Sequence, residues 1–104
     1  MINTGNDINV FECEGNLNRD IEFRQNNGKE IAFFSVFTCR KLNDEVSVSD
    51  RHSFVVKGAM LKNEELNKLK KGVRVHCKGV LTYFKREGQI PSAEIQCTEF
   101  KIVK

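Results

Sequence analysis

Basic side chains are concentrated in the second half of this chain, and their clustering indicates a polyanionic ligand. Residues 1–50 carry a net charge of −4, whereas residues 51–104 carry +7. Between positions 66 and 86 there are seven basic residues and no acidic one: Lys68, Lys70, Lys71, Arg74, Lys78, Lys85 and Arg86. Such an excess attracts polyanions, nucleic acid first, although most lysine-rich runs are only solvated surface.

The residue types that catalysis or metal binding requires do not occur in suitable combinations. The sequence shows no nucleophile beside a base, no paired carboxylates and no glycine-rich phosphate loop, and His52 and His76 are isolated. The cysteines form no CxxC pair, and each lies in a predicted strand: Cys13, Cys39, Cys77 and Cys97. We therefore expect buried free thiols rather than a zinc site with a histidine, no cofactor, and a binding protein rather than an enzyme.

The longest predicted strand, residues 72–86, places part of the basic cluster on one face. By the two-residue period of a strand, Val75, Cys77 and Leu81 share one side, together with Tyr83, which predicts a structural role for that tyrosine. The opposite side is polar and cationic and consists of Arg74, His76, Lys78, Val80, Thr82 and Phe84. Gly79 interrupts the run and predicts a bulge that lets one strand serve two sides of a small barrel.

Apolar and polar residues alternate in several other segments, and residues 30–42 are largely apolar. Strands are therefore also predicted at residues 8–17, 21–25, 30–42, 51–58 and 92–103. The sequence Asn26-Asn27-Gly28 predicts a tight hairpin turn, and residues 43–50 predict a polar loop or hairpin tip. Leucines at helical spacing over residues 60–71 predict one short helix that stops at Gly72. Residues 1–7 have no periodicity and predict a flexible arm.

The strand predicted at residues 30–42 is apolar on both faces between Ile31 and Phe37. A barrel of this size has only one interior, so the second face must meet a partner subunit, a ligand or a covering loop. Phe33 and Phe37 are candidates for stacking on bases, and packing against another subunit is the alternative.

Three main strands, a helix and two further strands is the element order of an all-β, five-stranded Greek-key OB-fold barrel with its helix between strands 3 and 4. The 104 residues predict one such domain, 1–104. No apolar run has membrane-spanning length and no secretory leader is visible, so we expect a cytoplasmic protein without membrane contact.

Residues in order along the chain also resemble the bacterial single-stranded DNA-binding protein family over about residues 9–103. The matching residues are Gly15-Asn16-Leu17, Arg19-Asp20, the Asn-Gly turn, His52, Val55, Val56, Gly58, the Leu-Lys-Lys-Gly of 69–72, Val75, Lys78-Gly79 and Leu81. The resemblance implies sequence-independent binding of single-stranded DNA, assembly as a homodimer or homotetramer, and protection of exposed strands in replication, repair or recombination.

The chain departs from that family in two features that change what we expect of DNA binding and of partner recruitment. The chain has no tryptophan, and the family's stacking positions align with Leu42, Arg51 and Arg86, with Lys57 at a further aromatic position. The acidic tail through which the family recruits repair proteins is missing, so recruitment by a tail is not expected. In this respect the chain resembles the shorter primosomal replication protein B, or a plasmid, phage or mobile-element form.

The expected single-stranded DNA site is a groove in which basic side chains hold phosphates and aromatic ones contact bases. Its candidate residues are Phe37, Arg40, Lys41, Arg51, Lys57, Arg74, His76, Lys78, Phe84, Lys85 and Arg86. The main rival is an OB-fold protein-interaction module of a replication-restart or mobile-element complex, with weak or no DNA binding, in which an outer face with Ile31, Phe33 and Phe37 binds another protein. A domain that binds structured RNA is a third possibility.

Overall fold

A computed structural model describes residues 7–84, 88 and 92–103 of the chain. These residues form six strands and two 3₁₀ helices: β1 (Phe11–Leu17), β2 (Glu22–Asn26), β3 (Lys29–Lys41), β4 (Ser47–Val56), η1 (Gly58–Lys62), η2 (Glu64–Lys68), β5 (Arg74–Phe84) and β6 (Ser92–Ile102). No helix within the described part of the chain is long and apolar enough to cross a membrane.

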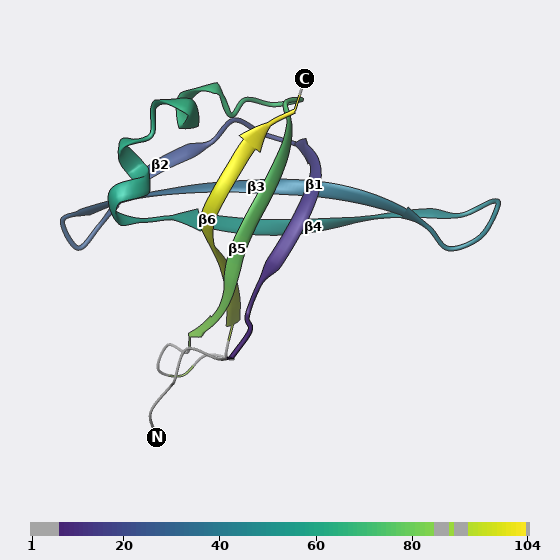
Figure 1. Ribbon diagram of the computed structural model, residues 1–104, viewed down its shortest axis with the longest axis horizontal. Coiled ribbons are helices and arrows are strands. Elements are labelled where there is room, and N and C mark those ends of the chain that lie inside the picture. The colour runs from purple at the N-terminus through teal and green to yellow at the C-terminus, as the bar shows by residue number, and fades with distance from the viewer. Residues whose placement is uncertain (1–6, 85–87, 89–91, 104) are drawn as a thin grey trace.

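Five of the strands close into a ring (Figure 1). The sheet order is β1-β5-β6-β4-β3-β2, and β1 also pairs with β3, where Asn16 lies opposite Phe37 and Leu17 opposite Val36. β2 is not part of this ring and pairs with the free edge at the start of β3. The predicted five-stranded OB-fold barrel is therefore confirmed, with β2 as an added edge strand.

Two glycines allow neighbouring strands to approach closely in this small barrel. The register between β5 and β6 shifts at Lys78 and Gly79, which confirms the predicted bulge, and a Cβ on Gly79 would lie 2.5 Å from the Gln96 carbonyl oxygen. A Cβ on Gly15 would lie 2.1 Å from the Phe37 carbonyl oxygen, where β1 leaves β5 and meets β3. Side chains at either position would hold the strands apart and oppose closure.

The single helix predicted over residues 60–71 is wrong in type, although its place between the third and fourth strands of the barrel is correct. The backbone of Asn63 is extended between η1 and η2, and its side chain accepts a hydrogen bond from the Glu65 amide. Asparagine competes with continuous helix in this way. Leu66 in η2 and Leu69, the residue that follows η2, both reach the core, with exposed fractions of 1% and 0%.

The core fills the inside of the ring. Alternate residues of β3 point inward, and Phe34 stacks on Phe54 of β4 at 5.1 Å between ring centroids. The remaining buried members of the cluster are Leu17, Ile21, Ala32, Val36, Val56, Leu66, Leu69, Val75, Cys77, Ile95 and Cys97. Among the cysteines, Cys77 and Cys97 are buried as predicted, Cys13 is half-buried, and Cys39 is exposed because β3 has left the barrel at that point.

β3 and β4 continue beyond the barrel as a long two-stranded hairpin (Figure 1). Asn43 Oδ1 accepts hydrogen bonds from the amides of Glu45 and Val46 at 2.8 and 3.0 Å, which closes the turn within residues 42–46. The loop predicted at residues 43–50 is therefore too long, since β4 begins at Ser47. The hairpin carries side chains on two faces well away from the core.

Candidate nucleic-acid interface

The outer face of β3 and β4 contains a groove with aromatic walls. Phe33 and Phe37 project from β3 on the side opposite to the core and are half-buried. They border a cavity of about 270 Å³, which is lined by Asn18, Arg19, Asp20, Glu22, Arg24, Phe33, Phe34, Ser35, Phe37, Arg51, Ser53 and Phe54. Flat apolar rings beside guanidinium groups are the combination that contacts bases and phosphates of single strands.

Three arginines and two carboxylates line this groove, but the carboxylates oppose only one of the arginines. Arg24 Nη2 lies 2.7 Å from Glu22 Oε2, and the Arg24 guanidinium lies 5.2 Å from the centroid of the Phe33 ring. Arg19 and Arg51 make no ion pair within the described part of the chain. Two guanidinium groups are thus available to a polyanion at this surface.

The hairpin between β2 and β3 brings Glu22 and Arg24 to the groove. Asn27 and Gly28 have φ angles of 53° and 78°, as a two-residue turn of type I′ requires. The turn sets the register, with Glu22 opposite Phe33 and Arg24 opposite Ile31. Sequence reasoning missed Arg19 and Arg24 as site residues, although counting outward from the Asn-Gly turn would have placed Arg24 on the same face as Phe33.

The same outer face continues along the projecting hairpin without a carboxylate. Beyond Phe37 and Arg51, which lie opposite each other, it carries Cys39, Lys41, Ser47 and Ser49. Cys39 Sγ lies 3.2 Å from the Ser49 hydroxyl, and Lys41 is exposed. The groove therefore opens into a strip of small polar side chains that ends at a lysine.

The opposite face of the hairpin is internally paired. Arg40 Nε lies 2.9 Å from Asp50 Oδ2, and Thr38 Oγ1 lies 2.9 Å from His52 Nε2. Arg40 was predicted to share the site of Lys41, but the two side chains point to opposite faces because they are adjacent in a strand.

Arg74, His76 and Lys78 of β5 lie beside the glutamates of β1. His76 Nε2 is 2.5 Å from Glu12 Oε2, and its Nδ1 is 3.2 Å from Glu14 Oε1. Arg74 Nε lies 3.1 Å from the other oxygen of Glu14. Lys78 lies opposite Glu12 in the β1 register and opposite Glu99 in the β6 register. The predicted cationic face of β5 is therefore a mixed-charge face.

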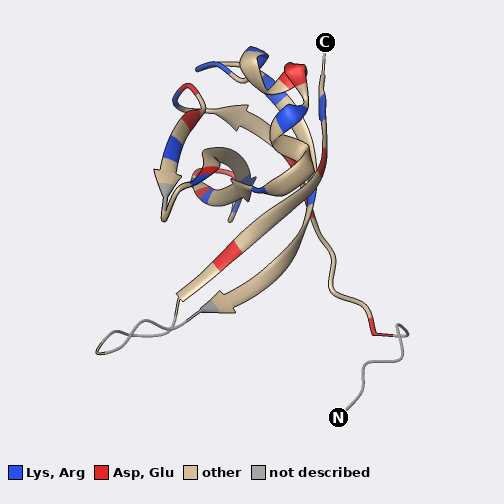
Figure 2. Ribbon diagram, turned by 90° about the vertical axis from the view of Figure 1, so that its left-hand side faces the viewer, with Lys and Arg blue, Asp and Glu red and all other residues tan. Residues whose placement is uncertain are grey.

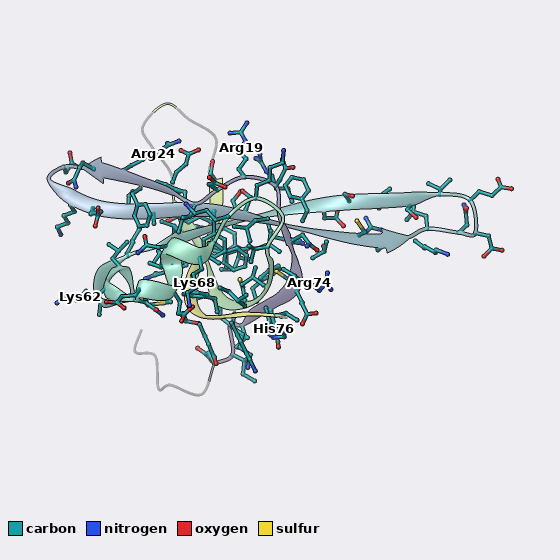
Figure 3. The ribbon with its side chains drawn as sticks, turned by 90° about the horizontal axis from the view of Figure 1, so that it is seen from above. Arg19, Arg24, Lys62, Lys68, Arg74 and His76 are labelled. Atoms are coloured by element: carbon teal, nitrogen blue, oxygen red, sulfur yellow. The ribbon has the colours of Figure 1, made fainter. Side chains whose placement is uncertain are left out.

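The proton affinities follow from these contacts. Hydrogen bonds with Glu14 and then Glu12 raise the pKa of His76, and hydrogen bonds with His76 and Arg74 lower the pKa of Glu14. Figure 3 places Arg74 and His76 on the opposite side of the barrel from Arg19 and Arg24. Figure 2 shows acidic and basic segments interspersed over the barrel rather than collected on one strand.

The remaining predicted residues lie away from the groove or outside the described residues. Lys57 Nζ is 3.4 Å from Glu94 Oε1. Tyr83 is 73% exposed, which contradicts the structural role predicted from its parity, since the end of β5 extends past the core. The side chain of Phe84 and all of Lys85 and Arg86 are outside the described residues.

The thiols of the buried Cys77 and Cys97 and of the half-buried Cys13 are poor nucleophiles. Burial raises the pKa of Cys13 and of Cys97 to about 11, and it raises that of Cys77 further. Within residues 7–84, 88 and 92–103, no group of three or more His, Cys, Asp and Glu side chains is arranged to hold a metal ion.

Known structures share this architecture. A Plasmodium falciparum SSB in complex with ssDNA superposes with a TM-score of 0.76 at 22% identity, covering 94% of this chain and 96% of its own. A deletion mutant of the single-stranded DNA binding protein from Thermus aquaticus gives a TM-score of 0.77 at 17% identity, covering 93% of this chain and 51% of its own. No protein-family model and no curated protein matches the sequence. The chain therefore has the OB-fold of these single-stranded DNA-binding proteins.

Proposed function

We propose that this protein binds single-stranded DNA without sequence preference, and that the groove on β3 and β4 is the binding site. The observation that carries the proposal is the combination of half-buried Phe33 and Phe37 with Arg19 and Arg51, whose charges have no carboxylate partner among the described residues. The shared fold with two single-stranded DNA-binding proteins supports it.

Each group has a defined part in this mechanism. The rings of Phe33 and Phe37 stack on bases, which every base permits because each presents a π face. Arg19 and Arg51 donate paired hydrogen bonds to phosphate oxygens. Lys41, at the far end of the strip, extends the contact to a later phosphate. Neither stacking nor phosphate contact depends on base identity, so binding is independent of sequence.

Binding without tryptophan should be unusually dependent on charge. Each stacked base contributes ~1–3 kcal/mol, and phenylalanine offers a smaller surface than tryptophan. Charge neutralisation releases counterions, with a slope of log K against log salt of about −0.7 per phosphate contacted. Affinity should therefore fall steeply as salt is added.

The wider role that we propose is the protection or organisation of exposed strands in replication, repair or recombination. The protein would act in the cytoplasm as a homodimer or homotetramer, as a binding protein and not as an enzyme. A form related to primosomal replication protein B fits this role.

Fluorescence anisotropy with labelled oligo-dT across a salt series tests the proposal. We expect binding that duplex DNA competes for poorly and that salt weakens strongly. Stronger competition by single-stranded RNA of the same length would reassign the ligand. No binding at low salt would contradict the proposal and favour the protein-interaction module, in which Phe33 and Phe37 contact another protein.

A further inference from the structure

The tip of the β3 and β4 hairpin, residues 42–46, is a knob of exposed aliphatic and acidic side chains. Leu42 and Val46 are 57% and 44% exposed, although both are large aliphatic residues. Asp44 and Glu45 lie between them, and neither carboxylate takes part in an ion pair within the described residues. Leu42 and Val46 face each other across the turn, so the tip combines exposed aliphatic surface with two carboxylates.

The knob is held in one shape before any contact forms. The amide of Leu42 donates to the Val46 carbonyl at 2.9 Å, and Asn43 Oδ1 accepts from the two amides of Glu45 and Val46. Behind the turn, the Arg40 and Asp50 ion pair joins the two strands. Little conformational entropy is lost when such a preformed segment docks.

The groove on β3 and β4 has the complementary character. It presents aromatic carbon from Phe33 and Phe37 and the unpaired guanidinium groups of Arg19 and Arg51, which match aliphatic side chains flanked by two carboxylates. The knob cannot reach its own groove. Leu42 is five residues beyond Phe37 on the same strand, about 17 Å at 3.4 Å per residue, and the strand runs away from the groove.

We propose that the tip at residues 42–46 docks into the β3 and β4 groove of a second copy of this chain. The contact is head to tail, so it propagates into chains or rings rather than closing as a symmetric pair. It occupies the same groove as the proposed single-stranded DNA, and nucleic acid and tip therefore compete. The docking itself requires only the groove and the tip, so it can be tested independently of DNA binding.

Charge reversal with rescue provides the test. Asp44→Lys with Glu45→Lys reverses the tip, and Arg19→Glu with Arg51→Glu reverses the groove. Glu64→Lys with Glu65→Lys in η2 is the matched control, since it changes the net charge as the tip variant does. Sedimentation velocity at low salt, over a wide range of protein concentration and without DNA, measures association. Circular dichroism and thermal melting confirm that each variant is folded.

We expect the wild type and the control to associate as concentration rises, and each reversed variant to associate roughly tenfold more weakly. An equimolar mixture of the tip and groove variants should recover association, because the reversed tip of one variant then faces the reversed groove of the other, and the unchanged tip faces the unchanged groove. Oligo-dT should disperse the wild-type assemblies if the groove binds DNA. Failure of that step alone would count against the proposed function and leave the docking intact.

Three results would overturn the docking itself. The first is a wild type whose mass is independent of concentration, and the second is association that tip reversal leaves unchanged. The third is a mixture that associates no better than its components. A constant dimer or tetramer in all variants would instead indicate a symmetric interface elsewhere.

Discussion

The two outer faces of the barrel differ in how their cations are paired. On the outer face of β3 and β4, Arg19 and Arg51 lie near aromatic rings and have no carboxylate partner among the described residues. On the outer face of β1, β5 and β6, Arg74 and His76 are paired with glutamates of β1. The second face also has a hollow, of about 760 Å³, with Glu12, Glu14 and Glu99 beside Lys78, Lys101 and His76. Lys78 and Lys101 of the second face make no ion pair among the described residues, but they share that face with three glutamates. The position of the carboxylates, more than the number of basic residues, distinguishes the two faces.

Removing an aromatic ring from the groove on β3 and β4 is the substitution expected to change oligo-dT affinity most. Phe37→Ala should weaken oligo-dT binding about 5- to 150-fold, since a stacked base contributes ~1–3 kcal/mol. Anisotropy titration measures the loss. Phe23→Ala is the control, because Phe23 is 43% exposed on β2 and does not line the groove. Equal losses in the two variants would mean that the groove rings are not the stacking platform.

Removing the carboxylate partner of the one paired arginine in the groove should instead strengthen oligo-dT binding. Glu22→Gln removes the partner of Arg24 and a negative charge beside the proposed phosphate path. Affinity for oligo-dT should rise about two- to fivefold, the range expected for an exposed ion pair. The parallel change on the other face, Glu14→Gln, frees Arg74 and should leave binding at moderate salt unchanged. A larger gain from Glu14→Gln would transfer the binding site to β5.

The smallest expected effect is a pH dependence confined to the β1 and β5 face. Because its partners raise the pKa of His76, the stability this residue contributes is complete below its unfolded pKa, about 6.5, and is lost as pH rises through the higher folded value. Glu14 contributes with the opposite sign, and its share is lost only as pH falls through its lowered folded pKa.

Thermal melting at a series of pH values measures this linkage. The wild type should lose melting temperature between mildly acidic and mildly alkaline pH, relative to His76→Gln, and the difference should shrink as pH rises. Oligo-dT affinity over the same range should be equal in the two proteins. A pH-dependent difference in affinity would show that the His76 face touches the nucleic acid.

The barrel was largely predictable from the sequence because its signals are local. Strand alternation, the Asn-Gly turn and the bulge at Gly79 each follow from a few neighbouring residues. The helix was wrong because Asn63 interrupts it through a side-chain bond to the Glu65 amide, a contact that the leucine spacing does not reveal. The loop predicted at the hairpin tip is too long because the Asn43 side chain also accepts hydrogen bonds from backbone amides, those of Glu45 and Val46, and closes the turn early.

The candidate site was less predictable because it depends on which distant strands become neighbours. Phe37 and Arg51 are candidates from the sequence, and in the structure they lie opposite each other at the groove. The neutralisation of Arg74 and His76 requires knowing that β1 pairs with β5 in the register that places Glu14 opposite His76, 62 residues away. Arg19 lay in a connection with no periodicity, so nothing in its neighbourhood assigned it to either face.

The most direct test of the account compares the salt dependence of binding after equal charge removal from each face. Arg19→Gln with Arg51→Gln removes two groove charges, and Arg74→Gln with Lys78→Gln removes two from β5. We expect the slope of log K against log salt for oligo-dT to become less negative by about 1.4 in the groove variant, about 0.7 for each lost phosphate contact, and to stay unchanged in the β5 variant. A flattened slope in the β5 variant with an unchanged slope in the groove variant would contradict the assignment of the binding face.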